Sequence, residues 1–131
     1  NINSTNHSNK SAIVSCVDKE FHEIGPKIIS DFFEMHGWNV FYLGANTPRG
    51  DVLKMIRDKQ PTVVGLSINF YMNLVRLMKV VEEINENFPE QQIIVGGQAL
   101  QDDKSGLLEE YKNVTYVASL DELEEYLNSF E

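Results

Sequence analysis

The sequence predicts an α/β domain, a doubly wound five-stranded parallel sheet with helices on both faces. Short β-favouring apolar runs alternate five times along the chain with segments of helical spacing. Gly37 ends the first helical segment, Pro61 precedes the third strand, and Pro89 follows the third helix. Such alternation requires parallel strands joined by right-handed crossovers, so the helices must cover both faces of the sheet.

The first half of the 131-residue chain supplies three of these strands and two helices. Residues 1–10 are rich in Ser and Asn, and are expected to form a flexible lead before a domain at 11–131. Strands are predicted at residues 12–17, 39–43 and 62–67, where apolar, β-favouring side chains gather. One-faced helical spacing separates them, at Ile24, Ile28, Ile29, Phe32 and Phe33 and then at Val52, Leu53 and Ile56.

The second half contains the clearest helix, because its apolar side chains repeat at i, i+3, i+4 and i+7. These side chains are Leu74, Leu77, Met78, Val81 and Ile84. Strands are predicted at residues 92–95 and 114–117, with a weaker helix around 107–111 between them. A last helix has Leu120, Leu123, Tyr126 and Leu127 on one face. Its start, Ser119 with Glu122 three residues later, has the form of a capping box.

Composition and charge exclude several classes of protein. The net charge is −9, and residues 82–131 carry thirteen acidic side chains but two basic ones, so no direct contact with nucleic acid is expected. No apolar run is long enough to span a bilayer, so no membrane partner is expected. Cys16, the single cysteine, is expected in the core and allows no internal disulfide, which fits a reducing, cytoplasmic location.

The predicted fold indicates where a ligand would bind. Open α/β sheets bind ligands at the carboxyl ends of the strands, beside the point where the strand order reverses. For the flavodoxin-like order 2-1-3-4-5, that point lies between the first and third strands. The loops that meet there are residues 18–25, 67–72 and 96–100. Candidate binding residues are therefore expected in these three loops.

The first loop carries an E-x-H-x-x-G pattern formed by Glu20, His22 and Gly25. A neutral imidazole is a strong ligand for a transition metal, and a carboxylate two residues away can accept its second N–H. Other ligand classes of this fold lack their motifs. The loop has no G-x-G-x-x-G, the chain has no Gly-Lys-Ser/Thr phosphate loop, and Ser67 stands where a phosphoacceptor domain needs aspartate. A zinc site is not expected, because closely spaced ligands are lacking.

Together, the three loops resemble the cobalamin-binding domain of corrinoid proteins, whose signature is D-x-H-x-x-G, then S-x-L, then G-G. The matching residues are Glu20, His22, Gly25, Ser67, Asn69, Gly96 and Gly97. The spacing also matches, with 41 residues between Gly25 and Ser67 and 26 between Asn69 and Gly96. The resemblance covers about residues 11–127. It implies cobalamin as the cofactor, in the adenosyl or the methyl form.

The resemblance also implies a role for each matched residue. His22 is the expected lower axial ligand of cobalt, and Glu20 is expected to hold the other ring nitrogen. The cofactor's nucleotide tail would enter a slot between the sheet and the flanking helices. Gly25 would let the chain turn tightly into the first helix, and Ser67 would offer its hydroxyl to the tail. The two glycines of the G-G element would leave space, because a Cβ there would block the benzimidazole end.

Three positions depart from the usual signature. Glu20 replaces aspartate, and Asn69 replaces the leucine of S-x-L. Glutamate before the histidine, together with the Tyr-Leu-Gly-Ala-Asn-Thr-Pro stretch at 42–48, resembles the cobalamin-dependent, light-sensing regulators of the MerR-type class. Tyr71 stands where many members have a small hydroxyl residue. It is expected either to pack over its loop or to contact the corrin ring or the tail slot.

The resemblance predicts a cobalamin-binding sensory or regulatory domain without catalytic activity of its own. Another domain or protein is expected to supply both the output and the cap over the upper corrin face. Two alternatives remain open. One is a corrinoid-carrying module of a methyltransferase or mutase, in which His22 would tune the cobalt. The other is a degenerate domain of this fold that binds haem or only a protein partner.

Overall fold

A five-stranded sheet with the order β2-β1-β3-β4-β5 forms the centre of the domain. The structure is a computed structural model that describes residues 9–97, 100, 106 and 108–130. Its strands are β1 (Ser11–Val17), β2 (Asn39–Thr47), β3 (Val63–Ser67), β4 (Gln92–Gly96) and β5 (Val114–Tyr116). Every pairing between neighbouring strands is parallel. The predicted fold class and strand order are therefore confirmed.

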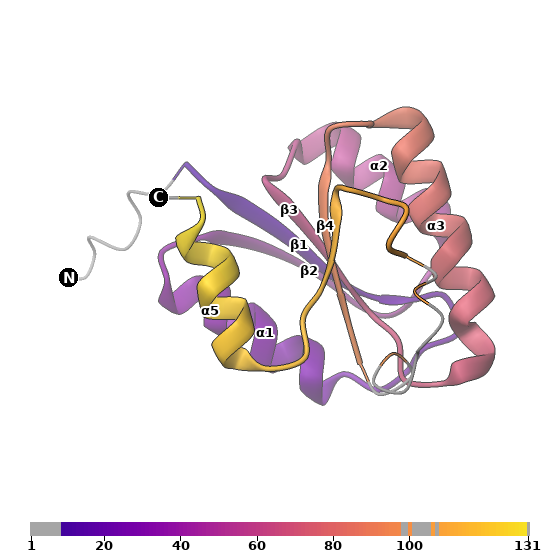
Figure 1. Cartoon of the computed structure of the whole chain (residues 1–131), viewed down its shortest axis with the longest axis horizontal. Helices are drawn as coiled ribbons and strands as arrows, with labels where there is room; N and C mark the ends of the chain where they lie inside the picture. Colours follow the sequence, from indigo (N-terminus) through magenta and orange to yellow (C-terminus); the bar gives the residue numbers. More distant parts are fainter. Residues whose placement is uncertain (1–8, 98–99, 101–105, 107, 131) are drawn as a thin grey trace.

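Helices cover both faces of the sheet, as the alternation predicts (Figure 1). Helices α1 (Ile24–Met35) and α5 (Leu120–Asn128) lie on one face. Helices α2 (Arg49–Lys59) and α3 (Leu74–Asn87) lie on the other, and the short 3₁₀ turn η2 (Tyr71–Asn73) leads into α3. Among the described residues, no helix has the length and apolar character needed to cross a bilayer. The cytoplasmic location stays a prediction.

The sheet divides the core into two apolar clusters, because successive side chains of a strand point to opposite faces. Ile13, Val64 and Ile93 are neighbours across three strands and pack against α2 and α3. On the opposite face, Val14 and Ile94 pack with Phe33 of α1 and with the buried leucines of α5. The central strands are thus buried on both sides, which explains their continuous apolar runs.

Two predicted elements differ from the structure. Strand β2 continues to Thr47, four residues beyond the predicted end, because its register with β1 shifts near Gly44 and pairing resumes. The predicted helix around 107–111 is wrong for its described residues, because 108–110 form a turn with a hydrogen bond from Glu109 N to Gly106 O. Leu107 lies outside the described residues, as do positions 1–8 of the expected lead.

The start of α5 confirms the predicted capping box. The Glu122 backbone N–H donates to Ser119 Oγ at 3.1 Å, and the Ala118 backbone N–H donates to Glu122 Oε1 at 2.9 Å. The first bond satisfies an amide group that the first turn of a helix leaves without a partner, and the second holds the residue before the N-cap against that turn. They fix the path of the chain between β5 and α5, which forms one wall of the site described next.

Candidate cofactor-binding site

The three central strands carry large apolar side chains along most of their length and small residues near their carboxyl ends. Cys16 of β1 lies opposite Ser67 of β3, and Ser67 lies opposite Gly96 of β4, so one row across the sheet carries small side chains. Gly65, two residues before Ser67 and therefore on the same face, widens this region. The row belongs to the face that α1 and α5 cover. The strands therefore leave space beneath those helices instead of filling it.

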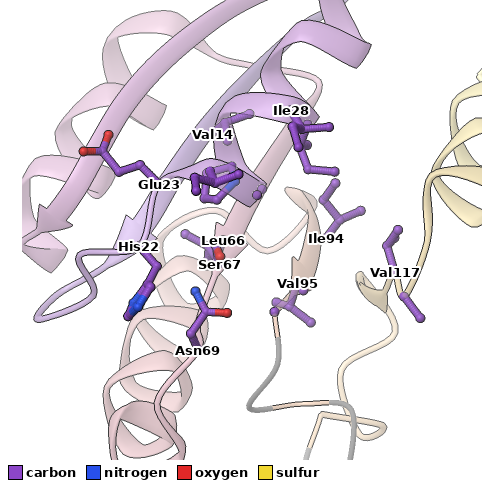
Figure 2. A pocket seen from close by; sticks show the side chains of 18 of the residues that line it. Val14, His22, Glu23, Ile28, Leu66, Ser67, Asn69, Ile94, Val95 and Val117 are labelled. Atoms are coloured by element: carbon purple, nitrogen blue, oxygen red, sulfur yellow. The ribbon is translucent and has the colours of Figure 1, made fainter.

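A cavity of about 900 Å³ occupies this space. Its floor is the small-residue region of the sheet, and its walls come from α1 and from the segment after β5. Figure 2 shows Ile28, Ile94 and Val117 around one part of the cavity, and His22 and Asn69 toward its other end. The cavity therefore joins an apolar interior to a polar mouth at the carboxyl edge of the sheet.

The structure brings six of the eight predicted site residues to this cavity. They are His22, Gly25, Ser67, Asn69, Gly96 and Gly97. The other two do not line the cavity. Glu20, in the first loop, is buried, and Tyr71, in η2, is 70% exposed. The apolar wall of Ile28, Ile94 and Val117 could not be predicted from the sequence, since such residues have the same spacing whether they fill a core or line a cavity.

The glycines at the cavity serve different purposes. Gly97 has a φ of +116°, and a Cβ there would lie 2.0 Å from the Ile68 carbonyl oxygen, so the backbone itself demands glycine. At Gly96, a Cβ would lie 3.2 Å from the Val117 carbonyl oxygen. A Cβ at Gly25 would have no atom within 4 Å. Gly25 is the second residue of α1 and leaves open space beside it, and its expected part in the turn into the helix stays a prediction.

His22 is exposed at the mouth of the cavity, in the segment between β1 and α1. The ring lies edge-on to Phe70, with 5.4 Å between the ring centroids and an interplanar angle of 68°. The Cys16 thiol donates a hydrogen bond to the His22 carbonyl oxygen at 3.4 Å, which ties this segment to β1. Large apolar side chains are exposed at the start of α1 and in the segment after β3, namely Phe21, Ile24, Phe70, Tyr71 and Met72. Such an apolar rim is typical of a surface that a ligand covers.

Glu20 is a buried carboxylate, with 1% of its surface exposed. Its Oε2 accepts hydrogen bonds from the Phe70 backbone N–H at 2.9 Å and from Asn73 Nδ2 at 2.7 Å. Its Oε1 is buried and has no hydrogen-bond partner in the part of the chain that the structure describes. No contact among the described residues joins Glu20 to the His22 ring, so the expected bond between them stays a prediction.

Two titratable groups close to the cavity, the Cys16 thiol and the Tyr42 hydroxyl, remain protonated at neutral pH. Burial, with smaller contributions from Glu23 and Glu20, raises the pKa of the Cys16 thiol to about 11. Tyr42 donates its hydroxyl to Glu23 Oε1 at 2.8 Å, and burial together with this bond raises its pKa well above the usual range. Glu23 consequently points away from the cavity, toward β2 (Figure 2). His22 lies at the mouth, where its ring could ligate a metal.

The protein alone does not form a metal centre in the described residues, where no group of three or more His, Cys, Asp or Glu side chains could hold an ion. A cavity of this size beside an exposed imidazole suits a cofactor that presents its metal at the mouth and an organic group inside.

A family model and a curated relative match most of this chain. The family model described as "B12 binding domain" matches residues 10–128. A methionine synthase from Mycobacterium leprae (strain TN) is 29% identical over 93 residues, 67% of this chain and 8% of that protein.

Two solved structures share the fold. A cobalamin-binding protein from Desulfitobacterium hafniense DCB-2 has a TM-score of 0.81 at 18% identity, over 93% of this chain and 59% of that one. The methanol:cobalamin methyltransferase complex MtaBC from Methanosarcina barkeri has a TM-score of 0.82 at 18% identity, over 92% of this chain and 45% of that one. The chain belongs to the B12 binding domain family, and its cofactor is cobalamin.

Proposed function

We propose that His22 is the lower axial ligand of cobalt and that the cofactor's nucleotide tail enters the cavity beneath α1 and α5. The observation that carries this proposal is the exposed imidazole at the mouth of a cavity of about 900 Å³. The cofactor fits the residues present, because the cavity combines small floor residues with an apolar wall that suits a flat, uncharged ring. Bound cobalamin would supply the cobalt–carbon chemistry, and the chain would hold and orient it.

The buried Glu20 oxygen without a partner supports the same role for His22. A ligating imidazole usually donates its second ring N–H to a carboxylate, which fixes the tautomer and raises the basicity of the ligating nitrogen. Glu20 Oε1 is buried and accepts no hydrogen bond among the described residues, a costly condition for a carboxylate. An N–H from His22, two residues further along the chain, would satisfy it. Glu20 would thus perform the role that aspartate has in the usual signature.

The proposed output is sensory or regulatory, without catalysis by this domain alone. This part rests on the E-x-H pattern of Glu20 and His22 and on the stretch at 42–48, both of which resemble cobalamin-dependent light-sensing regulators. The apolar rim of Phe21, Ile24 and the 70–72 segment would lie under the corrin ring and meet a cap from another domain or protein. A cluster of large exposed apolar side chains is typical of a surface that binds a partner or a ligand.

A second candidate is a corrinoid-carrying module of a methyltransferase. The similarity to methionine synthase and to the MtaBC complex favours it. The chain spans only 8% of the length of the curated relatives it matches, so their complete reactions are not transferred to it. Methyl transfer from the cofactor-loaded domain to a partner's substrate would favour this candidate, whereas oligomerisation that changes on photolysis of adenosylcobalamin would favour the sensory role.

Titration of the domain with hydroxocobalamin, followed by absorbance, tests the binding proposal. We expect a spectral change on binding that His22→Ala abolishes and His36→Ala preserves. His36 is a matched control, because it is also exposed but caps the far end of α1 through a 2.9 Å bond between Nδ1 and Phe32 O. A wild-type spectrum that does not change, or one that is equally changed in His22→Ala, would contradict the proposal.

A further inference from the structure

We propose that the edge strand β2 positions the axial-ligand loop, residues 18–23, by holding it on both sides of His22. Tyr42 holds the residue that follows the histidine, and Asn46 holds the part of the loop that precedes it. This inference rests on the proposed role of His22 as the cobalt ligand. It makes Tyr42 and Asn46 positioning residues, although both lie outside the three-part signature.

The axial-ligand loop needs support from its neighbours, because it belongs to no helix or strand. Regular secondary structure therefore does not fix the position of its backbone, and contacts with adjacent elements have to do so. Lys19 in this loop has a φ of +72°, in the left-handed region that residues other than glycine adopt infrequently. Such a conformation persists where the surrounding structure enforces it, often at a functional site.

Strand β2 reaches the loop because it continues past the regular part of its pairing with β1. While β1 advances from Val14 to Val17, its partner advances from Tyr42 to Thr47, so β2 contains extra residues here. Extra residues of this kind bend a strand and redirect its side chains. Thr47 pairs with the last residue of β1, and Asn46 therefore lies beside the turn that begins the loop.

Asn46 exchanges two hydrogen bonds with the loop. Its Oδ1 accepts from the Lys19 backbone N–H at 2.9 Å, and its own backbone N–H donates to the Glu20 carbonyl oxygen at 2.6 Å. Asn46 has a φ of +50°, which asparagine tolerates better than most residues do. The two bonds hold adjacent residues, so they fix the direction of the chain just before His22.

Tyr42 fixes the residue directly after His22. Its hydroxyl donates to Glu23 Oε1 at 2.8 Å, and bonds to carboxylates are stronger than bonds between neutral groups. Burial, and then this bond, raises the pKa of Tyr42 well above the usual range, so its hydroxyl stays the donor at neutral pH. A Cβ at Gly44 would lie 3.3 Å from the same oxygen, so glycine leaves room for the carboxylate. Glu23 is the N-cap residue of α1, and the bond thus also holds the start of that helix.

These bonds leave the His22 ring available while they restrain the backbone on either side of it. Figure 2 shows the Glu23 side chain and the His22 ring pointing away from each other. A ligand on a restrained loop loses less conformational freedom on binding than a ligand on a free one. The support from β2 therefore raises the affinity of the domain for cobalt at His22 without a contact to the metal.

The experiment uses cob(II)inamide, a corrinoid without the nucleotide tail. Because this probe carries no nitrogen base of its own, nitrogen splitting in its electron paramagnetic resonance spectrum must come from a protein ligand. Histidine labelled with ¹⁵N identifies that ligand by changing the splitting. Dissociation constants for the same probe are measured by absorbance, and thermal melting reports whether each variant is folded.

We expect Tyr42→Phe and Asn46→Ala each to weaken cobinamide binding by about three- to thirtyfold, because each removes a hydrogen bond that orders the loop. Both should also lower the fraction of bound cobalt that shows histidine splitting. Asn46→Asp should bind as the wild type does, since aspartate keeps an oxygen acceptor for the Lys19 N–H and tolerates a positive φ.

Two matched controls make the same chemical changes away from the loop. Tyr126→Phe removes a buried hydroxyl that has no partner among the described residues. Asn85→Ala removes an amide whose Nδ2 donates to Val81 O within α3. Both controls should keep the affinity and the histidine splitting of the wild type.

A double-mutant cycle with His22→Ala distinguishes positioning from a general structural role. If β2 acts through the histidine, Tyr42→Phe and Asn46→Ala should not weaken cobinamide binding further once His22 is alanine. An equal loss of affinity in both backgrounds would overturn the inference, because the two residues would then act independently of the histidine.

Two other results separate this inference from the function on which it rests. If His22→Ala loses the splitting while folded Tyr42→Phe and Asn46→Ala bind and split as the wild type does, the role of β2 is overturned and the role of His22 stands. If the wild type shows no histidine splitting, both are overturned. Should Tyr42→Phe fail to fold, Glu23→Ala breaks the same bond from the loop, and unchanged splitting there would overturn the role of Tyr42.

Discussion

Replacement of Gly97 by alanine is the sharpest test of how the cavity is built. Gly97 follows β4 directly and has a φ of +116°, a conformation that side-chain-bearing residues rarely adopt. A Cβ placed there would lie 2.0 Å from Ile68 O, 2.8 Å from Ile68 C and 2.9 Å from Ile68 N. All three atoms belong to the backbone, so no side-chain rotation can relieve the overlap.

The expected loss of stability follows from two terms. A residue held in a sparsely populated backbone region costs about 1–3 kcal/mol. Forcing one extra carbon into a packed region costs about 1–3 kcal/mol more. Their sum, about 4 kcal/mol, is a large part of the roughly 5–15 kcal/mol that stabilises a typical domain. With a urea slope of about 1.5 kcal/mol per molar, the midpoint of unfolding should fall by roughly 2–3 M.

Urea unfolding followed by circular dichroism measures this loss, and Gly96→Ala provides the control. At Gly96 the added Cβ would lie 3.2 Å from Val117 O, with no positive φ, so we expect a loss of about 1 kcal/mol or less. A Gly97→Ala domain that loses less than about 1 kcal/mol, or no more than Gly96→Ala, would refute the argument that the backbone demands glycine here.

Three further predictions concern other groups in the domain. Gly25→Ala should leave stability unchanged or raise it by about 0.5 kcal/mol, because alanine favours helices. The same change should weaken cobalamin binding in an absorbance titration, because the added Cβ projects into the open space of the cavity. Equal binding would argue against a tail at that position. Tyr126→Phe should be neutral or stabilising by about 1 kcal/mol in thermal melting, because the Tyr126 hydroxyl is buried without a partner among the described residues. Stability should fall as pH rises from about 9 to 11, because the folded state keeps the Cys16 thiol protonated, with its pKa raised to about 11 from 9.0. Cys16→Ala should lessen that alkaline loss, and an unchanged pH profile of unfolding would contradict it.

The sequence was sufficient to predict the fold. It was also sufficient to predict that residues from the three signature loops lie close together at one edge of the sheet. The apolar runs of β1, β3 and β4 are buried on both faces, and this property requires a parallel sheet with helices on each side. Once that topology is inferred, the carboxyl ends of neighbouring strands must adjoin. His22, Ser67 and Gly96 therefore reach the same cavity although they are distant along the chain.

The parts that could not be predicted depend on local turns and on contacts between distant residues. Tyr71 was expected either to pack over its loop or to contact the corrin ring or the tail slot. In the structure η2 leaves its side chain exposed and outside the cavity lining, so a contact with the corrin ring stays a prediction. Glu20 and Asn73 are 53 positions apart, and no periodicity links them. Asparagine before a helix is also common as a simple cap. Only coordinates reveal that its amide faces a buried carboxylate.

The distribution of charge indicates which part of a nucleotide tail the cavity can accept. None of the described residues that line it is Lys or Arg, and the lining is mostly apolar or small. The N-terminus of α5 adjoins the cavity, and Asp121 and Glu122 add negative charge in its first turn. An anionic phosphodiester would therefore find no Lys or Arg among the described lining residues and two carboxylates at the helix terminus. An uncharged aromatic base loses little on leaving water, so the arrangement favours the base within the cavity and the phosphate toward solvent.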